Sequence, residues 1–168
     1  MDPLDGTKEF INRRTDFTVN IALIKGGLPV LGVVLTPYDG LLWAGSETLG
    51  AFVEDAGGNR EVISTRKPNT ENLTVVASRS HRSPELEDYI AALNVGKAIS
   101  RGSSLKFCLL ASGQADIYPR LGPTMEWDTA AGHAVLLAAG GRLINFDGTP
   151  FEYGKPEYRN GWFIAYGH

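Results

Sequence analysis

The chain has 168 residues, of which 43% are hydrophobic and 21% are charged, with a net charge of −3 and a single cysteine. This length fits one globular domain with a sizeable core, and the small negative charge argues against nucleic acid or an anionic membrane as a partner. The lone cysteine excludes an internal disulfide, and no apolar run reaches the ~18 residues of a membrane-spanning helix. We therefore expect a cytoplasmic protein.

The first third of the chain is predicted to be a meander of antiparallel strands. Short β-branched or aromatic runs occupy residues 16–24, 29–37, 41–46 and 50–54. The segments between these runs are rich in glycine, which is typical of hairpin turns. Residues 64–72 contain no apolar side chain, so they are predicted to form a surface linker.

After the linker, strands alternate with helices, which predicts a layered α/β arrangement. The helix expected over residues 83–94 has Ser83 as its N-cap and Pro84 at its first position. Two more helices are expected over residues 103–113 and 127–141, both of which end on glycine. The predicted strands are 73–78, 96–100, 115–120, 142–146 and 161–167.

The predicted domain organisation follows from this change of pattern. Residues 1–63 are expected to form an antiparallel-sheet half, residues 64–72 the linker, and residues 73–168 an α/β half. Within the second half, Cys108 lies in the apolar run FCLLA, so a buried thiol is expected rather than a nucleophile. His133, on an apolar helix, is expected to be packed rather than to bind a ligand.

The most charged stretch of the chain is its start, MDPLDGTKEF. Asp-Pro and Asp-Gly are common turn formers, so a tight turn is one interpretation. The alternative is half of a metal site, because Asp2 and Asp5, on a chain stiffened by Pro3, could direct both carboxylates and the carbonyl of Leu4 at one cation. Hard divalent cations, Mg²⁺ above all, prefer oxygen ligands. Asp128, in EWDTAAG at the start of a helix, is either an N-cap or a further carboxylate ligand.

The pairing of DPLDGT with a later WDTAAGH resembles the inositol monophosphatase superfamily, and the resemblance covers essentially the whole chain. The continuation KEF and the runs ASRSHR, GSSLKFC and ADIYPR are similar to its CysQ-type 3′(2′),5′-bisphosphate nucleotidase branch. The resemblance implies a layered α/β/α/β/α sandwich, N-terminally truncated. It also implies Mg²⁺-dependent removal of the 3′-phosphate from a small phosphorylated nucleotide, 3′-phosphoadenosine 5′-phosphate (PAP), which would give AMP in sulfur metabolism. Such hydrolysis uses a metal-activated water and needs no covalent phosphoenzyme.

The resemblance also implies roles for individual residues. The implied metal ligands are Asp2, Leu4 (through its carbonyl), Asp5 and Asp128. Gly6 and Thr7 would meet the scissile phosphate, and Thr7 would also hold the attacking water, so that the implied catalytic set is Asp2, Asp5, Thr7 and Asp128. The second phosphate requires cations and hydrogen-bond donors, and the matching positions are His81, Ser103, Lys106 and Arg120.

Purely structural roles remain possible for the four residues assigned to the second phosphate. Lys106 and Arg120 could be ordinary surface cations, and His81 a loop or helix-entry residue. Ser103 could cap the helix that contains Lys106.

The chain departs from the family pattern at its N-terminus. In the family a further region, with a metal-ligating glutamate, precedes DPLDGT, and neither Glu9, Glu47 nor Glu126 matches that motif. We therefore expect a truncated chain with weak activity and an uncovered, apolar sheet face. Inositol monophosphatase or sugar bisphosphatase activity remains an alternative. So does a non-catalytic remnant that binds an anion or a partner subunit, for which an exposed sheet edge would favour a homodimer.

Overall fold

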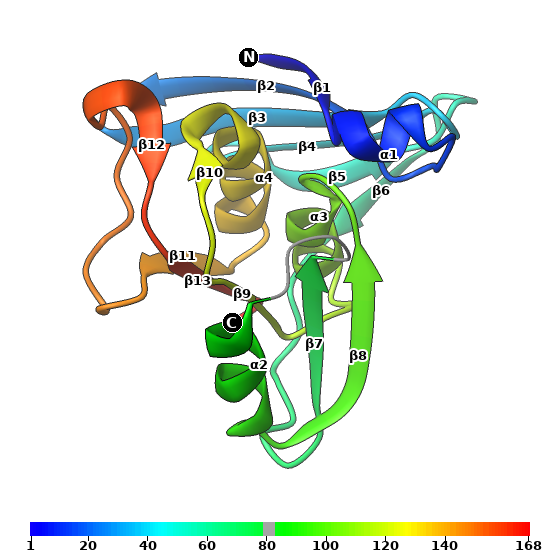
Figure 1. The fold of residues 1–168 in the computed structure, drawn as a ribbon. Coiled ribbons are helices and arrows are strands. Elements are labelled where there is room, and N and C mark those ends of the chain that lie inside the picture. Colours follow the sequence, from blue (N-terminus) through cyan, green and yellow to red (C-terminus); the bar gives the residue numbers. More distant parts are fainter. Residues whose placement is uncertain (79–82) are drawn as a thin grey trace.

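The computed structural model describes residues 1–78 and 83–168, which form two large sheets with helices between and beside them (Figure 1). The first sheet is antiparallel, with its strands in chain order. Its strands are β1 (Asp2–Asp5), β2 (Thr18–Lys25), β3 (Leu28–Thr36), β4 (Leu41–Ser46), β5 (Gly50–Glu54) and β6 (Arg60–Ile63).

The second sheet is mixed and has the order β11-β13-β9-β7-β8, in which β7 lies parallel to both β8 and β9. Parallel neighbours require crossover connections, as the alternation of strands and helices in the sequence predicts. Its strands are β7 (Leu73–Ser78), β8 (Val95–Arg101), β9 (Ile117–Arg120), β11 (Arg142–Asn145) and β13 (Phe163–Tyr166).

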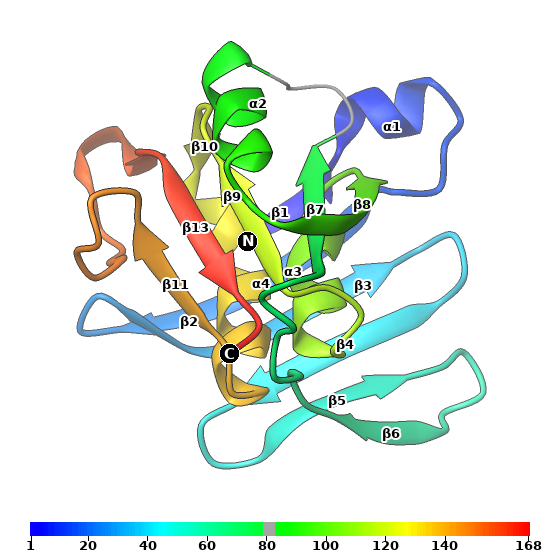
Figure 2. The ribbon, with the colours of Figure 1, turned by 90° about the horizontal axis from the view of Figure 1, so that it is seen from below.

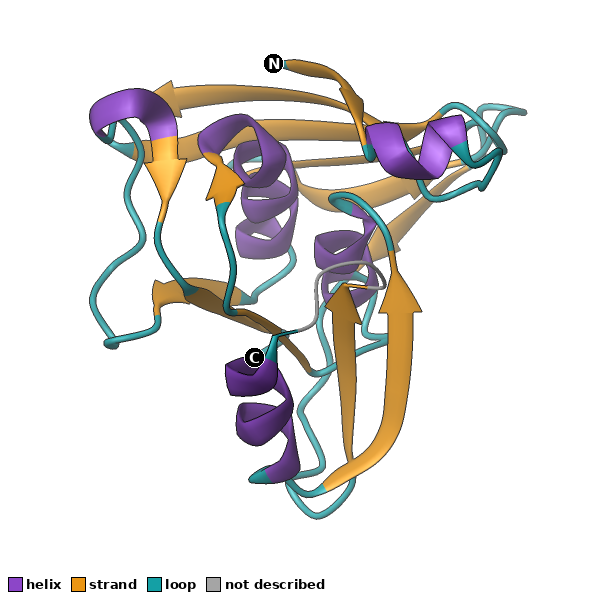
Figure 3. Cartoon of the chain, viewed as in Figure 1, coloured by secondary structure: helices purple, strands orange, loops and turns teal. Residues whose placement is uncertain are grey.

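Helices α3 (Leu105–Ala111) and α4 (Glu126–Ala138) lie between the two sheets in both views (Figures 1 and 2). Helix α2 (Pro84–Ala91) packs on the five-stranded sheet with Tyr89 and Ile90. Its N-cap Ser83 accepts a hydrogen bond from the backbone N–H of Leu86, 3.3 Å away, as the sequence predicts. The layered sandwich is thus confirmed, and the described residues form its β/α/β/α layers (Figure 3).

Helix α4 lies directly against the six-stranded sheet because the strands on which it packs, β3 and β4, carry glycine. A Cβ atom at Gly32 on β3 would lie 2.3 Å from the carbonyl oxygen of Ala131, and one at Gly45 on β4 would lie 2.8 Å from the Cα atom of Val135. The alanine-rich face of α4 completes this close approach. The position of α4 matters for function, because Asp128 lies in its first turn.

We expect Gly32→Ala to destabilise the fold by about 1–3 kcal/mol, because the added methyl group overpacks the contact between β3 and α4. Urea unfolding measures the free energy of unfolding directly. Gly161→Ala is the matched control, since a Cβ atom there would have no neighbour within 4 Å. Equal stabilities of the two variants would contradict this account of the packing.

The outer face of the six-stranded sheet is apolar and uncovered within the described residues, as expected. Ile21 and Leu23 on β2 lie opposite Val33 and Leu31 on β3. The exposed fractions are 47% for Ile21, 59% for Leu23 and 39% for Leu31. Self-association through this sheet stays a prediction.

Several short elements were not predicted. The segment DPLD, for which a tight turn was one interpretation, is the edge strand β1, which pairs with β2 in an interrupted register. The other unpredicted elements are α1 (Thr7–Ile11), β6, β10 (Thr124–Met125), the 3₁₀ turn Pro156–Tyr158 and β12 (Arg159–Asn160). Strand β10 pairs with β12 across more than thirty residues of chain, and such a contact leaves no local pattern in the sequence.

The segment 64–72 contains neither helix nor strand, but it is bonded to the second half of the chain. The guanidinium of Arg66 donates hydrogen bonds to both carboxylate oxygens of Asp116, at 2.7 and 2.8 Å. The division of the chain into two halves at this segment stays a prediction.

Two residues occupy the positions expected from the sequence. Cys108 is buried in the core. His133 is also buried, with Nδ1 3.0 Å from the hydroxyl of Tyr153.

Within the described ranges, none of the helices combines the length and the hydrophobicity that a bilayer crossing requires.

Candidate metal and phosphate site

Three carboxylates from distant parts of the sequence converge beside β1. Asp2 and Asp5 lie on β1, and Asp128 lies on α4. One oxygen atom from each carboxylate lies within 4.8 Å of the others. The structure therefore brings together the three side chains that the sequence singled out, in an all-oxygen set of the kind that hard divalent cations prefer.

Asp128 is not the N-cap of its helix, which was one interpretation of the sequence. Helix α4 begins at Glu126, so Asp128 is its third residue, and Met125 stands at the N-cap. The Oδ2 atom of Asp128 accepts a hydrogen bond from the backbone N–H of Met125 at 2.7 Å. This bond fixes the orientation of the carboxylate on the first turn of the helix.

Asp5 is held by three donors. Its Oδ2 atom accepts hydrogen bonds from the backbone N–H of Ser104 at 2.7 Å, from Asn20 Nδ2 at 3.2 Å and from Thr18 Oγ1 at 3.4 Å. Thr18 and Asn20 are fully buried, and both contact the hydroxyl of Ser104, at 2.8 and 2.7 Å. These supporting residues were missed from the sequence. A signal was present, since Thr18 and Asn20 are polar side chains on the inward face of an otherwise apolar strand.

The chain turns sharply after Asp5, and this turn requires glycine. Gly6 has φ = 84°, a left-handed conformation that favours glycine. A Cβ atom there would lie 3.0 Å from the carbonyl oxygen of Asp16 and 3.3 Å from Ser103 Cβ. The turn places the hydroxyl of Thr7 next to the carbonyl of Leu4, to which it donates a hydrogen bond of 3.3 Å. A carbonyl has two lone pairs, so this bond leaves one for another partner.

A cavity of about 280 Å³ opens beside the carboxylates. The residues of interest that line it are Asp5, Gly6, Thr7, Ser103, Lys106, Arg120 and Asp128. Its walls therefore carry two carboxylates of the acidic cluster, Asp5 and Asp128, together with the buried cations Lys106 and Arg120. His81 lies outside the described residues, so its expected place in this site stays a prediction.

The two cations are buried, which argues against the interpretation that they are surface residues. Lys106 and Arg120 are 4% and 7% exposed. Lys106 donates a hydrogen bond to the carbonyl of Ser103, and Arg120 Nη2 donates one to the carbonyl of Pro123 at 3.0 Å. In the described part of the chain, Arg120 Nε and Ser103 Oγ are buried without a hydrogen-bond partner. Ser103 is not a helix cap either, because Ser104 stands at the N-cap of α3.

The electrostatics of the site favour a bound cation next to the carboxylates. The pKa of Asp5 is raised to about 6, mainly by burial and also by the nearby charges of Asp128 and Asp2, against the opposing effects of Lys106 and of the Ser104 N–H. Burial also raises the pKa of Asp128. The pKa of Lys106 falls to about 8, mainly through burial and also through the charge of Arg120. A divalent cation would relieve the repulsion among the three carboxylates.

We expect Mg²⁺ affinity to depend on pH through Asp5. Metal ligands must be deprotonated to bind, so a proton on Asp5, whose pKa is about 6, competes with the cation. The apparent association constant should therefore be nearly constant above pH 7 and fall by about tenfold per pH unit below pH 6. Calorimetric titration with Mg²⁺ at pH 5.0 and pH 7.5 measures this. Equal affinities at the two pH values would show that Asp5 does not bind the metal.

Comparison with known proteins gives a consistent result. Residues 1–161 match the model of the inositol monophosphatase family. The 3′(2′),5′-bisphosphate nucleotidase CysQ of Shigella flexneri is 50% identical over 153 residues, which are 91% of this chain and 61% of that protein. The match covers 57–61% of the length of the curated CysQ relatives, which is less than two thirds of those proteins.

Solved structures show the same fold. The crystal structure of CysQ from Bacteroides thetaiotaomicron has a TM-score of 0.90 at 43% identity, covering 98% of this chain and 68% of that one. An inositol monophosphatase from Zymomonas mobilis has a TM-score of 0.81 at 28% identity, covering 99% of this chain and 63% of that one.

Proposed function

Because this chain belongs to the inositol monophosphatase family, we propose that it carries the metal- and phosphate-binding site of a Mg²⁺-dependent phosphatase that converts PAP to AMP and phosphate. One observation carries the proposal: the three carboxylates lie together beside a cavity that also holds two buried cations. The names of the nucleotidase relatives support the choice of a nucleotide that bears two phosphates. A cytoplasmic location is part of the same proposal.

The residues present fit a Mg²⁺ site. Asp2, Asp5 and Asp128 would hold the ion through carboxylate oxygens, and Leu4 through its carbonyl. When bound, Mg²⁺ lowers the pKa of a water molecule and neutralises phosphate charge.

Residues of this chain would position the phosphate, the attacking water and the carboxylate of Asp5. The turn at Gly6 lets the phosphate approach the backbone closely. The hydroxyl of Thr7 would orient the attacking water, since it already lies at the end of β1 beside the carbonyl of Leu4. Thr18, Asn20 and Ser104 keep Asp5 in place throughout.

The second phosphate would be bound by Lys106, Arg120 and Ser103. A buried ammonium or guanidinium group is costly unless it is paired, and the acidic cluster compensates Lys106 only in part. Arg120 Nε and Ser103 Oγ are buried donors that lack a partner among the described residues, and a phosphate in the cavity would satisfy both. An arginine can bind phosphate through two parallel hydrogen bonds.

The proposed function predicts substrate preference. The kcat/KM for PAP should exceed that for inositol 1-phosphate by at least about tenfold, because inositol 1-phosphate has no second phosphate for Lys106 and Arg120 to bind with charge-assisted hydrogen bonds. Phosphate release is measured for both substrates with Mg²⁺, and with EDTA as the control. Equal values, or a preference for inositol 1-phosphate, would reject the assignment to PAP.

A further inference from the structure

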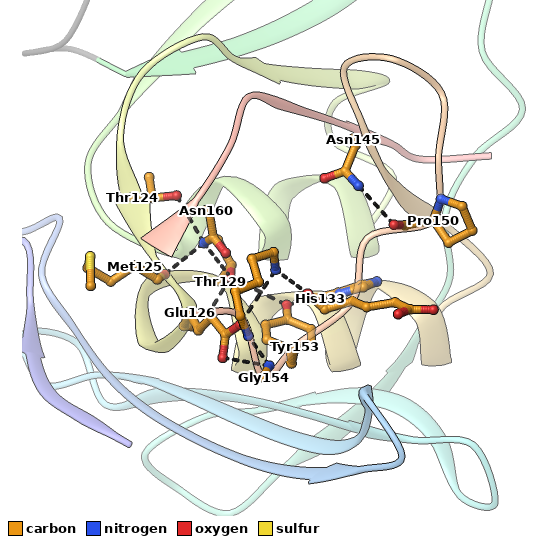
Figure 4. A network of polar contacts seen from close by, with 12 residues as sticks. Thr124, Met125, Glu126, Thr129, His133, Asn145, Pro150, Tyr153, Gly154 and Asn160 are labelled. Atoms are coloured by element: carbon orange, nitrogen blue, oxygen red, sulfur yellow. Dashed lines mark hydrogen bonds and ion pairs between the residues drawn. The ribbon is translucent and has the colours of Figure 1, made fainter. Parts of the chain in front are cut away.

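A network of polar contacts joins the C-terminal part of the chain to the start of α4 (Figure 4). Asn160, on β12, is only 4% exposed. Its Nδ2 atom lies 2.9 Å from the carbonyl oxygen of Met125, 3.1 Å from Thr124 Oγ1 and 3.2 Å from Thr129 Oγ1. One buried amide group therefore contacts both the residues before α4 and its first turn.

A second contact fixes the same helix start. The carboxylate of Glu126 accepts hydrogen bonds from the backbone N–H groups of Gly154 at 2.8 Å and Lys155 at 2.9 Å. The ammonium group of Lys155 lies 3.6 Å from the same carboxylate. Glu126 is the first residue of α4, so the loop before β12 is also tied to this turn.

The backbone carbonyl and N–H groups of Met125 connect this network to the acidic cluster. Its carbonyl oxygen accepts the hydrogen bond from Asn160, and its N–H donates the hydrogen bond to Asp128 Oδ2. Asn160 therefore restrains the residue whose N–H restrains a candidate metal ligand. This chain of contacts runs from β12 to the site.

We infer that Asn160 is a positioning residue for Asp128, acting through Met125, so that residues 151–160 set the geometry of the metal site without contacting it. The inference rests on the proposed function for its consequence, which is metal affinity. Groups that orient a metal ligand typically change the affinity by about 10–100-fold when they are removed.

The test compares Asn160→Ala with Asn145→Ala. Asn145 is the matched control, because its Nδ2 atom donates a hydrogen bond of the same length, 2.9 Å, to the carbonyl of Pro150, in a turn without site residues (Figure 4). Asn160→Asp is the second variant, since it keeps the shape of the side chain and removes its donor. Each 168-residue variant is measured for Mg²⁺ affinity by calorimetry, for hydrogen exchange at the Met125 amide by NMR, and for melting temperature.

The expected result is that both Asn160 variants bind Mg²⁺ about 10–100-fold more weakly, and that exchange at Met125 becomes about fivefold faster. Asn145→Ala should change neither quantity, even where it lowers the melting temperature. Unchanged exchange at Met125 in a folded Asn160 variant would overturn the inference. Because the exchange measurement needs no metal, a wild-type chain that fails to bind Mg²⁺ would refute the proposed function separately.

Discussion

Asp5→Asn is expected to lower Mg²⁺-dependent phosphate release from PAP by at least about 100-fold. Removing a group that only orients a ligand costs about 10–100-fold in metal affinity or activity, and Asp5 is proposed as a ligand itself. The substitution keeps the side chain's size and its contact with the N–H of Ser104, but it removes the charge that holds the cation. Activity is measured for the chain, or for a longer polypeptide that contains it, at saturating Mg²⁺.

The control for this variant is Asp147→Asn, which changes an exposed carboxylate in a surface turn. It should leave both phosphate release and Mg²⁺ affinity unchanged. Near-normal turnover by Asp5→Asn, with the control equally active, would remove Asp5 from the metal site.

Lys106→Ala should weaken the binding of PAP by roughly ten- to more than a hundredfold, because a charge-assisted hydrogen bond contributes about 1.5–3 kcal/mol. A 3′-monophosphate, which lacks the second phosphate, should lose far less. The assay belongs at pH 7.5, above the pKa of about 6 of Asp5. Lys106 lowers that pKa, and at lower pH its loss would also protonate the metal site.

Lys97→Ala, which removes an exposed lysine from β8, is the control for a general loss of positive charge. It should bind both substrates as the unmodified chain does. If Lys106→Ala weakens both substrates equally, Lys106 serves the catalytic phosphate or the fold, and the second phosphate is bound elsewhere.

Periodic segments were predictable from the sequence, and short or long-range ones were not. The strands β2 to β5 and β7 follow runs of β-branched or aromatic residues, and the helix α2 follows a serine cap and a proline. The strand β1 was missed because Pro3 and two aspartates favour a turn locally. Its strand conformation depends on pairing with β2, which is a tertiary contact.

In the candidate site, too, some residues were predictable from the sequence and others were not. The motifs DPLDGT and WDTAAGH pointed to Asp2, Asp5 and Asp128, and the structure brings these three together. The motifs did not point to Asn160, since it reaches the site through a backbone carbonyl 35 residues away in sequence. Supporting contacts of this kind depend on how distant segments meet, so a single sequence does not reveal them.

The most direct test of the central claim is to locate the metal by anomalous scattering from Mn²⁺ in crystals of this chain. Mn²⁺ is suited to the same oxygen ligands as Mg²⁺. We predict one strong peak within about 2.0–2.3 Å of carboxylate oxygens from Asp2, Asp5 and Asp128, facing the cavity that contains Lys106 and Arg120. A peak at another group of side chains, or no peak among these carboxylates at millimolar Mn²⁺, would contradict the account.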